Sequence, residues 1–196
     1  MRIISGSAKG RKILSPLNEG KITQKGELQA TRPTLDRVKV SMFDILGHKV
    51  FDAEVLDMFA GTGSLGLECA SRGAKKVVFI EKFKETFGIL KKNIENLKFS
   101  DISAAYNRDS YEFIKLLGSK EEKFDIIFVD PPYLNHMVDD SIRLIEKFAL
   151  LKEDGVIVTK YDKSEKIYKP EGIYELVDER KYGNTILGFY QVRLEE

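Results

Sequence analysis

The stretch VLDMFAGTGSLGLE, residues 55–68, combines an apolar run with three closely spaced glycines. It starts as a short apolar run, as in a buried strand, and continues through Gly61, Gly63 and Gly66 into a helix-like segment. Glycines at this spacing permit a tight turn from strand to helix and let the backbone lie close to a ligand. On spacing alone the stretch predicts a cofactor of the nucleotide type, with NAD and S-adenosylmethionine (SAM) as the two candidates.

Strand-like and helix-like stretches alternate along the chain after residue 54. The expected strands are residues 55–60, 76–81, 102–106, 124–130 and 155–161, the last of them after a turn at Asp154–Gly155. Buried strands that alternate with amphipathic helices predict a parallel sheet covered on both faces. The runs YELVDERKYG and NTILGFYQVRL meet around Gly183–Asn184 and predict an antiparallel hairpin at the end of the sheet.

The N-terminal part, residues 1–50, is expected to be an extension of a domain that spans residues 51–196. Residues 1–49 hold ten Lys or Arg against four Asp or Glu, a balance of +6. A basic part of this kind can steer an anionic polymer toward one face of the molecule.

Two elements are expected in this extension. RIISGSAKGRKIL predicts a hairpin punctuated by glycines, and a polar loop follows it to about residue 33. TLDRVKVSMFDIL then predicts a helix with Thr34 as its N-cap. The apolar face of this helix is expected to comprise Val38, Met42, Ile45 and Leu46.

Carboxylates near the glycine turn help to choose between the two cofactors. Asp57 lies in the apolar strand, four residues before Gly61, where an ionised group needs partners that offset its burial. Such a carboxylate can order the glycine loop and face the cationic amino-acid end of SAM, but it would repel a pyrophosphate, so SAM is favoured. Glu81 ends the second strand, where a carboxylate can bind ribose hydroxyls. Asp109 and Ser110 follow the third strand, where they either hydrogen-bond an adenine ring or simply cap a helix.

The fourth strand ends in Asp130-Pro131-Pro132-Tyr133, because proline cannot donate to the ladder of a sheet. Open α/β sheets bind ligands at the carboxyl ends of their strands. There, the Asp130 carboxylate and the Pro131 carbonyl can accept both N–H bonds of an exocyclic amino group, and Asp130 can receive its proton. Tyr133 offers a face on which a base can stack, for about 1–3 kcal/mol. Together with the glycine turn, the motif predicts methyl transfer to an amino group of a planar base.

Five stretches carry a resemblance that spans almost the whole chain. They are RIISGSAKGRKI (2–13), TRPTLDRVKVSMFDIL (31–46), VLDMFAGTGSLGLECASRGAKKVVFIEK (55–82), FDIIFVDPPY (124–133) and RKYGNTILGFY (180–190). The chain resembles the class I SAM-dependent methyltransferases that act on amino groups, and more closely the RsmD-type 16S ribosomal RNA guanine-N2 methyltransferases. The resemblance implies an α/β, Rossmann-like, mostly parallel seven-stranded sheet with an antiparallel C-terminal hairpin strand, and a small N-terminal hairpin and helix.

The resemblance also implies roles for particular residues, with SAM as cofactor, S-adenosylhomocysteine as product and no metal. The residues that would hold SAM are Asp57, Ala60, Gly61, Gly63, Glu81, Lys82, Asp109 and Ser110. Those that would hold the target guanine are Asp130, Pro131, Pro132 and Tyr133. Those that would contact ribosomal RNA are Lys9, Arg11, Lys12, Arg32, Thr34 and Arg37. Two features depart from the family pattern: Val40, where an acidic residue is usual, and a longer polar loop at 17–30.

The composition limits what else the chain can be. No apolar run approaches the roughly 20 residues that cross a bilayer, so no membrane span is expected. Cys69 is the only cysteine, which excludes an internal disulfide, and it forms no metal-binding pattern with His48 or His136. We expect a cytoplasmic monomer, and the resemblance implies that it acts on ribosomal RNA within a small ribosomal subunit or an assembly intermediate.

Several alternatives stay open on the sequence. The same DPPY chemistry serves adenine-N6 or cytosine-N4 methylation of DNA, although 196 residues hold no obvious target-recognition domain. A glutamine amide of a protein is another amino-group substrate. An RNA-binding module could keep a SAM-type fold without catalysis, and an NAD oxidoreductase could use the same glycine spacing.

Overall fold

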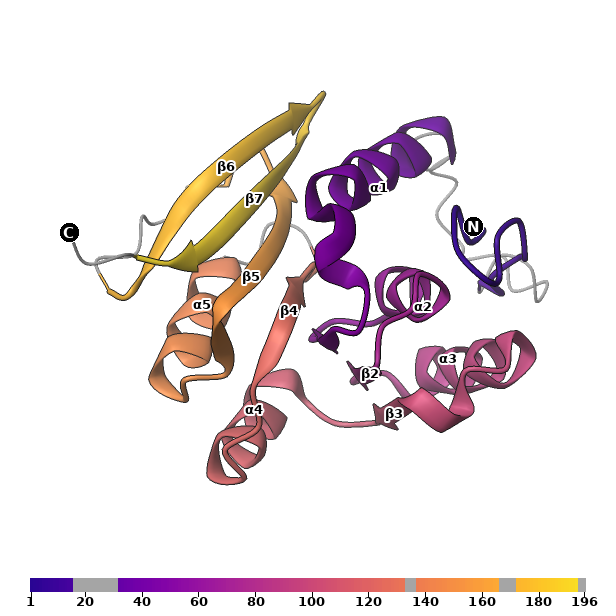
Figure 1. The fold of residues 1–196 in the computed structure, drawn as a ribbon, viewed down its shortest axis with the longest axis horizontal. Helices are drawn as coiled ribbons and strands as arrows, with labels where there is room; N and C mark the ends of the chain where they lie inside the picture. Colours follow the sequence, from indigo (N-terminus) through magenta and orange to yellow (C-terminus); the bar gives the residue numbers. More distant parts are fainter. Residues whose placement is uncertain (16–31, 133–136, 166–171, 194–196) are drawn as a thin grey trace.

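The computed structural model describes residues 1–15, 32–132, 137–165 and 172–193. Its centre is a seven-stranded sheet in the order β3-β2-β1-β4-β5-β7-β6 (Figure 1). The strands are β1 (Glu54–Asp57), β2 (Lys76–Ile80), β3 (Ser103–Tyr106), β4 (Phe124–Val129), β5 (Leu151–Asp162), β6 (Tyr174–Tyr182) and β7 (Thr185–Val192). β1 to β5 pair in parallel, and β7 pairs antiparallel with both β5 and β6. The predicted α/β fold with an antiparallel C-terminal hairpin is therefore confirmed.

Helices cover both faces of the sheet. They are α1 (Arg32–Leu46), α2 (Ser64–Ser71), α3 (Lys84–Leu97), α4 (Ser110–Ser119) and α5 (Met137–Lys147), with the short 3-10 helices η2 (Gly47–Val50) and η3 (Ser100–Ile102). In Figure 1, α1, α2 and α3 lie on one side of the sheet, and α4 and α5 lie on the other. Each side has its own hydrophobic cluster, because successive strand residues point to opposite faces: Val55 belongs to one cluster and Leu56 to the other. None of the helices described is long and apolar enough to cross a bilayer.

The strand order reverses between β1 and β4. From β1 the sheet continues to β2 and β3 on one side, and from β4 it continues to β5 on the other. Connections therefore leave β1 and β4 in opposite directions, and a crevice opens at the carboxyl ends of the two strands. Asp57 ends β1 and Asp130 directly follows β4, so two predicted site residues come to this point.

The first helix differs in detail from the expectation. α1 begins at Arg32, two residues before Thr34, so the predicted start of the helix is wrong. Pro33 lies in the first helical turn, where a proline is tolerated. Ile45 is 38% exposed, whereas Phe43 is 1% exposed. Phe43 packs against the sheet, with its ring centroid 6.0 Å from that of Phe128. The prediction of the apolar face was therefore wrong to include Ile45 and to leave out Phe43.

β5 is longer than expected. It begins at Leu151, so the Asp154–Gly155 step, which predicts a turn ahead of the strand, lies inside it. Phe124 pairs with Leu151, but Ile126 pairs with Val156, so the register between β4 and β5 shifts at this step. A bulge of this kind accommodates Asp154 and Gly155, and the strand continues beyond them.

The expected N-terminal hairpin is present in reduced form. One antiparallel bridge joins Arg2 and Lys12. Ile3 and Ile13 are fully buried and belong to the same hydrophobic cluster as α1, α2 and one face of the sheet. The N-terminal segment therefore shares a core with the rest of the chain, and a domain division near residue 50 stays a prediction.

A buried carboxylate holds this segment against α2. Glu68 is 0% exposed and accepts hydrogen bonds from the N–H groups of Ile4 and Ser5, both at 2.9 Å. It also pairs with Lys39 Nζ at 2.9 Å and with Arg72 Nε at 3.0 Å. Burial by itself would raise the pKa of Glu68, but the Lys39 ammonium and the Ile4 N–H outweigh it and lower that pKa below its usual value. One buried charge thus ties together α1, α2 and the N-terminal segment.

Glu68→Gln is expected to lower the free energy of unfolding by about 3–5 kcal/mol, because Lys39 and Arg72 would lose their buried counter-charge. Urea unfolding measures the loss. Glu122→Gln is the matched control: the side chains of the Lys76–Glu122 pair are 38% and 35% exposed, and breaking such a pair should cost about 1 kcal/mol or less. Equal losses in the two variants would contradict the role given to Glu68.

Candidate active site

Two adjoining depressions open at the carboxyl ends of β1, β2 and β4. The first has a volume of about 500 Å³ and the second a volume of about 270 Å³. Phe59, Gly61 and Asp130 line both, so the two depressions meet at the switch point between β1 and β4. The first continues past Glu81 and Asp109, and the second continues toward α1. The first depression has the size of a small-molecule site, for which about 300–1,000 Å³ is typical.

Glu81 connects the turns that follow β1 and β2. Its Oε2 accepts a hydrogen bond from Gly61 N–H at 2.9 Å, and its Oε1 accepts one from Phe83 N–H at 2.7 Å. Gly61 has a φ of +55°, which side-chain-bearing residues rarely adopt, and no atom lies within 4 Å of the position that a Cβ would take. The backbone at Gly61 therefore borders open space, as expected where a cofactor lies close to the main chain.

Asp57 lies behind the glycine turn and is not among the residues that line the first two depressions. It is 2% exposed, and its Oδ2 accepts a hydrogen bond from Gly66 N–H at 3.0 Å. A Cβ on Gly66 would lie 2.3 Å from the ring of Phe79, so only glycine lets α2 pack this closely on β2. The position of Asp57 thus suits the ordering of the glycine loop, and its contact with a cofactor stays a prediction. Gly63 is buried in the same turn, whereas Ala60 lines the second depression.

Three carboxylates meet at the ends of these strands, and their charges influence one another. The pKa of Asp57 is raised to about 7, and burial is the largest cause. The Gly66 N–H and the Lys39 ammonium oppose the rise, whereas the carboxylates of Asp130 and Glu81 add to it. Additional positive charge at this place would therefore favour the ionised form of Asp57.

Asp109 and Ser110 cap a helix and also line the first depression. Asp109 Oδ1 accepts a hydrogen bond from Tyr111 N–H at 3.0 Å, which makes Asp109 the N-cap of α4. Its Oδ2 pairs with Lys82 Nζ at 3.1 Å, and Lys82 lines the same depression. The buried hydroxyl of Ser110 donates to the carbonyl of Met58, which follows β1. Capping is therefore observed, and contact with an adenine ring stays a prediction.

Three aromatic residues in the wall of the first depression were not singled out from the sequence: Phe59, Phe83 and Tyr111. Phe59 and Tyr111 meet edge to face, with ring centroids 6.3 Å apart and an angle of 82° between the planes. Phe83 is 64% exposed, so its ring is accessible to a ligand. Each of the three follows a predicted cofactor residue by two positions, and that spacing was the signal that could have found them.

Asp130 directly follows β4 and is bound by Lys160 of the neighbouring strand β5. Lys160 Nζ lies 2.8 Å from Oδ1 and 2.9 Å from Oδ2 of Asp130. Pro131 is buried and Pro132 is exposed, and both line the first depression. Tyr133, like His136, lies outside the described residues, so the predicted stacking role of Tyr133 stays a prediction. Sequence reasoning missed Lys160, because a lysine near the end of an apolar strand is typical of a solvated strand end.

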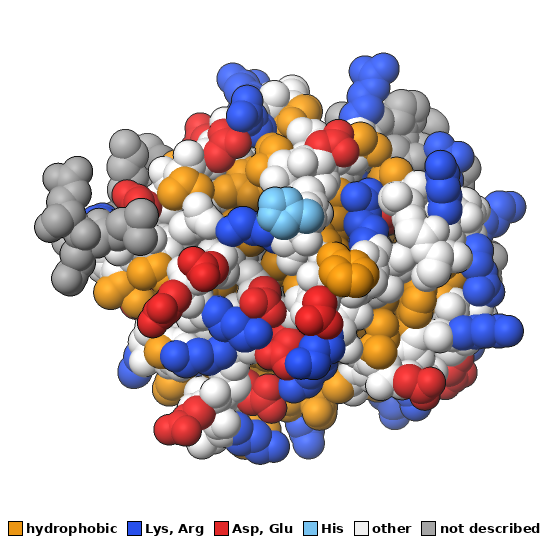
Figure 2. All heavy atoms as spheres, viewed as in Figure 1, with side chains coloured by type: hydrophobic (Ala, Val, Ile, Leu, Met, Phe, Trp, Pro, Cys, Tyr) orange, Lys and Arg blue, Asp and Glu red, His pale blue; other side chains and the backbone are white. Residues whose placement is uncertain are grey.

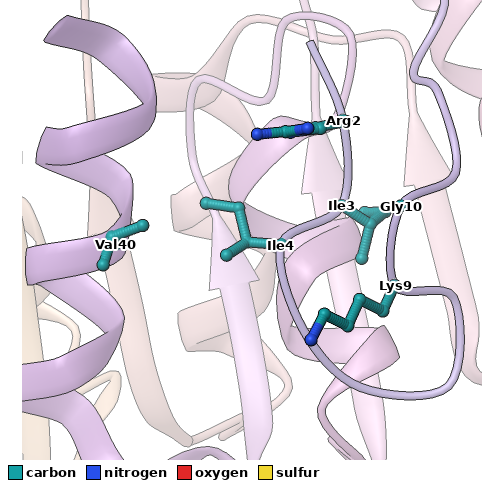
Figure 3. A pocket seen from close by; sticks show the side chains of 6 residues that line it. All are labelled: Arg2, Ile3, Ile4, Lys9, Gly10 and Val40. Carbon is teal, nitrogen blue, oxygen red and sulfur yellow. The ribbon is translucent and has the colours of Figure 1, made fainter. Parts of the chain in front are cut away.

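A third depression, with a volume of about 230 Å³, lies between the N-terminal segment and α1. In Figure 3, the side chains of Arg2 and Lys9 extend from the N-terminal segment toward α1, on which Val40 lies. Lys39 Nζ, which belongs to the wall of the second depression, lies 3.4 Å from the carbonyl oxygen of Arg2. A residue that lines the third depression thus contacts a residue that lines the second. The third depression combines two cations with the apolar Val40 and Ile4.

The structure brings only some of the predicted RNA contacts to this depression. Lys9 lines it, whereas Arg11 donates a hydrogen bond to the carbonyl of Asn96 on α3. Lys12 and Arg37 are exposed. The side chains of Arg32 and Thr34 and the loop at 17–30 lie outside the described part of the chain. On the face shown in Figure 2, acidic and basic side chains lie side by side, so the described residues give that face a mixed charge.

Several known proteins that are similar to this chain carry the names of methyltransferases. A family model described as "Conserved hypothetical protein 95" matches residues 1–191. "Ribosomal RNA small subunit methyltransferase D" of Haemophilus influenzae is 36% identical over 97% of this chain and 93% of the relative. The protein of the same name from Escherichia coli strain K12 is 31% identical over 97% of this chain and 89% of the relative. The solved structure "Putative methyltransferase yhhF from Escherichia coli" has a TM-score of 0.82 and 28% identity, and the match covers 100% of this chain and 99% of that chain.

Asp57→Asn is expected to remove a pH dependence from the stability of the free protein. Folding raises the pKa of Asp57 from its usual 3.8 to about 7, so the stability that Asp57 contributes is present below about pH 4 and is lost as the pH rises through 7. The variant should exceed the wild type in free energy of unfolding at pH 8, by on the order of 2–4 kcal/mol, since one pKa unit corresponds to about 1.4 kcal/mol. The difference should shrink toward pH 4.

Urea unfolding between pH 4 and pH 8 measures this difference. Asn is the suitable replacement, because its Oδ1 can still accept the hydrogen bond from Gly66 N–H. A difference between variant and wild type that stays constant over this pH range would contradict the raised pKa of Asp57.

Proposed function

Since the chain belongs to the Conserved hypothetical protein 95 family, we propose that it transfers the methyl group of SAM to the exocyclic N2 amino group of a guanine in small-subunit (16S) ribosomal RNA. The observation that carries the proposal is the position of Asp130, between two depressions and beside a glycine turn that carboxylates hold in place. The names of the relatives support methyl transfer and small-subunit ribosomal RNA. The protein would act as a monomer on the small subunit or an assembly intermediate.

SAM fits the first two depressions by their size and by the groups in their walls. Its ribose hydroxyls can donate to Glu81, and its adenine can stack on the exposed ring of Phe83. The ammonium of Lys39, in the wall of the second depression, can attract the carboxylate of the methionine end. The backbone at Gly61 borders both depressions and has room for a ligand beside it. When bound, SAM would supply an electrophilic methyl group, whose bond to sulfur breaks as the methyl group is transferred, and S-adenosylhomocysteine would be the leaving group.

Asp130 and Pro131 prepare the amino group of the guanine for the transfer. The Asp130 carboxylate and the Pro131 carbonyl each accept a hydrogen bond from one of its two N–H groups. These two hydrogen bonds direct the nitrogen lone pair out of the base plane. Asp130 then accepts the proton that N2 loses as its bond to carbon forms. The adjacent prolines restrict the backbone, so the two acceptors need little reorganisation during the reaction.

The proposal is tested by methyl transfer from labelled SAM to small ribosomal subunits that lack their modifications, with deproteinised ribosomal RNA and duplex DNA in parallel. Mass spectrometry of the digested nucleosides should identify N2-methylguanosine. Asp130→Asn should lower the rate about 100- to 10,000-fold, because Asn has one acceptor oxygen and cannot take up the proton. N6-methyladenine or N4-methylcytosine in the DNA, or a variant as fast as the wild type, would count against the proposal.

The RNA would approach the site past the third depression. Arg2 and Lys9 can pair with phosphates, which position a nucleic acid, and the adjacent apolar surface of Val40 can contact a base. Because the Arg2 carbonyl oxygen lies 3.4 Å from Lys39 Nζ, a strand bound there runs next to the second depression and Asp130. Arg37, exposed on the same helix as Val40, adds positive charge to this approach.

Lys9→Ala is expected to weaken RNA binding and to make its salt dependence less steep. Each lost phosphate contact should reduce the slope of log K against log salt by about 0.7–0.9. Fluorescence anisotropy with a labelled rRNA fragment, over a series of salt concentrations, measures the slope. Lys75→Ala is the control, because Lys75 is exposed just ahead of β2, at the opposite end of the sheet from Asp130. Identical slopes for the wild type and both variants would rule out a phosphate contact at Lys9.

A further inference from the structure

The ion pair between Lys160 and Asp130 restrains the carboxylate of Asp130. Both Asp130 oxygens lie within hydrogen-bond distance of one ammonium, at 2.8 Å and 2.9 Å. The Lys160 side chain is 15% exposed and that of Asp130 is 27% exposed, so solvent screens the pair less than it screens a surface pair. A charge-assisted contact to both oxygens defines the orientation of the carboxylate as well as its position.

The sheet holds the backbone at both ends of this pair. β4 and β5 run in parallel with Val129 opposite Thr159, so Asp130 and Lys160 are the next residues along neighbouring strands. Lys160 is also paired with Leu187 of β7, which places its backbone inside the sheet. The side chain of Lys160 therefore extends from a rigid base, whereas Asp130 lies at the point where β4 ends.

The contact leaves Asp130 able to accept further hydrogen bonds. A carboxylate has about four lone-pair positions, and the two contacts to Lys160 use one on each oxygen. We infer that Lys160 is a positioning residue, which holds the Asp130 carboxylate in the orientation that meets the amino group of the guanine. This inference rests on the proposed function, because it assigns Lys160 a role through Asp130.

Neighbouring charges explain why such a support is needed. Asp130 interacts unfavourably with the buried carboxylate of Asp57, which lies behind the same crevice. Without the ammonium of Lys160, this repulsion would favour rotation of the Asp130 side chain toward solvent. The amino group of the guanine would then lose one of its two acceptors.

Lys160→Met and Lys160→Arg test the role. Met removes the ammonium but retains an unbranched chain, and Arg retains a cation that can bind both carboxylate oxygens. With saturating small subunits and SAM, kcat of Lys160→Met should fall about 10- to 100-fold, since displacement of a catalytic group by 1 Å can cost about 100-fold. Because Lys160 also lines the second depression, calorimetry sets the SAM concentration that saturates each variant. KM for the subunit should change little, and Lys160→Arg should recover most of kcat.

Lys152→Met is the matched control. Lys152 lies on the same strand and pairs with Asp125 at 2.8 Å and Glu54 at 3.1 Å, so its loss removes contacts of the same kind at the other end of the strand. This variant should keep the kcat of the wild type. A second readout needs no turnover: Lys160→Met and Asp130→Asn should shift the urea midpoint non-additively when combined, because they remove the same ion pair.

The outcomes separate this inference from the proposed function. If the wild type forms N2-methylguanosine and Lys160→Met keeps its kcat, the inference is overturned and the proposed function stands. The inference also fails if Lys152→Met loses as much kcat as Lys160→Met, or if the two urea shifts are additive. A wild type that forms no N2-methylguanosine overturns the proposed function itself, and with it the role of Lys160 in the reaction.

Discussion

The parallel pairing of β1 with β4 determines where the functional side chains lie. Parallel strands bring their carboxyl ends to the same edge, and the strand order reverses at this pair, so the edge opens into a crevice. β1 contributes Asp57, and Asp130 follows β4. The flanking strands add Glu81 after β2 and Lys160 on β5. A slip of one residue in this register would turn the buried side chains to the opposite face, so the site depends on the apolar packing that sets the register.

The site holds several carboxylates in an apolar setting, and each has a partner that compensates for its burial. Backbone N–H groups serve Glu81 and Asp57, and the ammonium of Lys160 serves Asp130. The raised pKa of Asp57 shows that the compensation at the end of β1 is incomplete. A cationic cofactor suits such a site, because it adds positive charge where the carboxylates repel one another. Glu68 extends the same principle to the N-terminal segment, which it ties to the helix that the glycine turn opens.

Local patterns predicted the parts of the site that depend on local backbone chemistry. The glycine turn and the end of β4 just before Asp130 follow from the conformational limits of glycine and proline. The resemblance to the family is confirmed by a match over residues 1–191. Lys160 could not be found in this way, because its partner lies on another strand and only the register between β4 and β5 brings them together. The contact of Arg11 with α3 could not be predicted either, because its guanidinium donates to the carbonyl of Asn96, which is far away in the sequence.

The α/β class, the order of strands and helices, and the turn residues at the ends of β1 and β4 could all be predicted from the amino-acid sequence. These features depend on hydrophobic periodicity and on the intrinsic backbone preferences of glycine and proline, which act over a few residues. The pairing of charges, the aromatic rings in the wall of the first depression and the place of Asp57 behind the glycine turn became visible only in the folded chain. Those outcomes depend on strand register and on burial, because both arise from contacts between segments that are far apart in the chain.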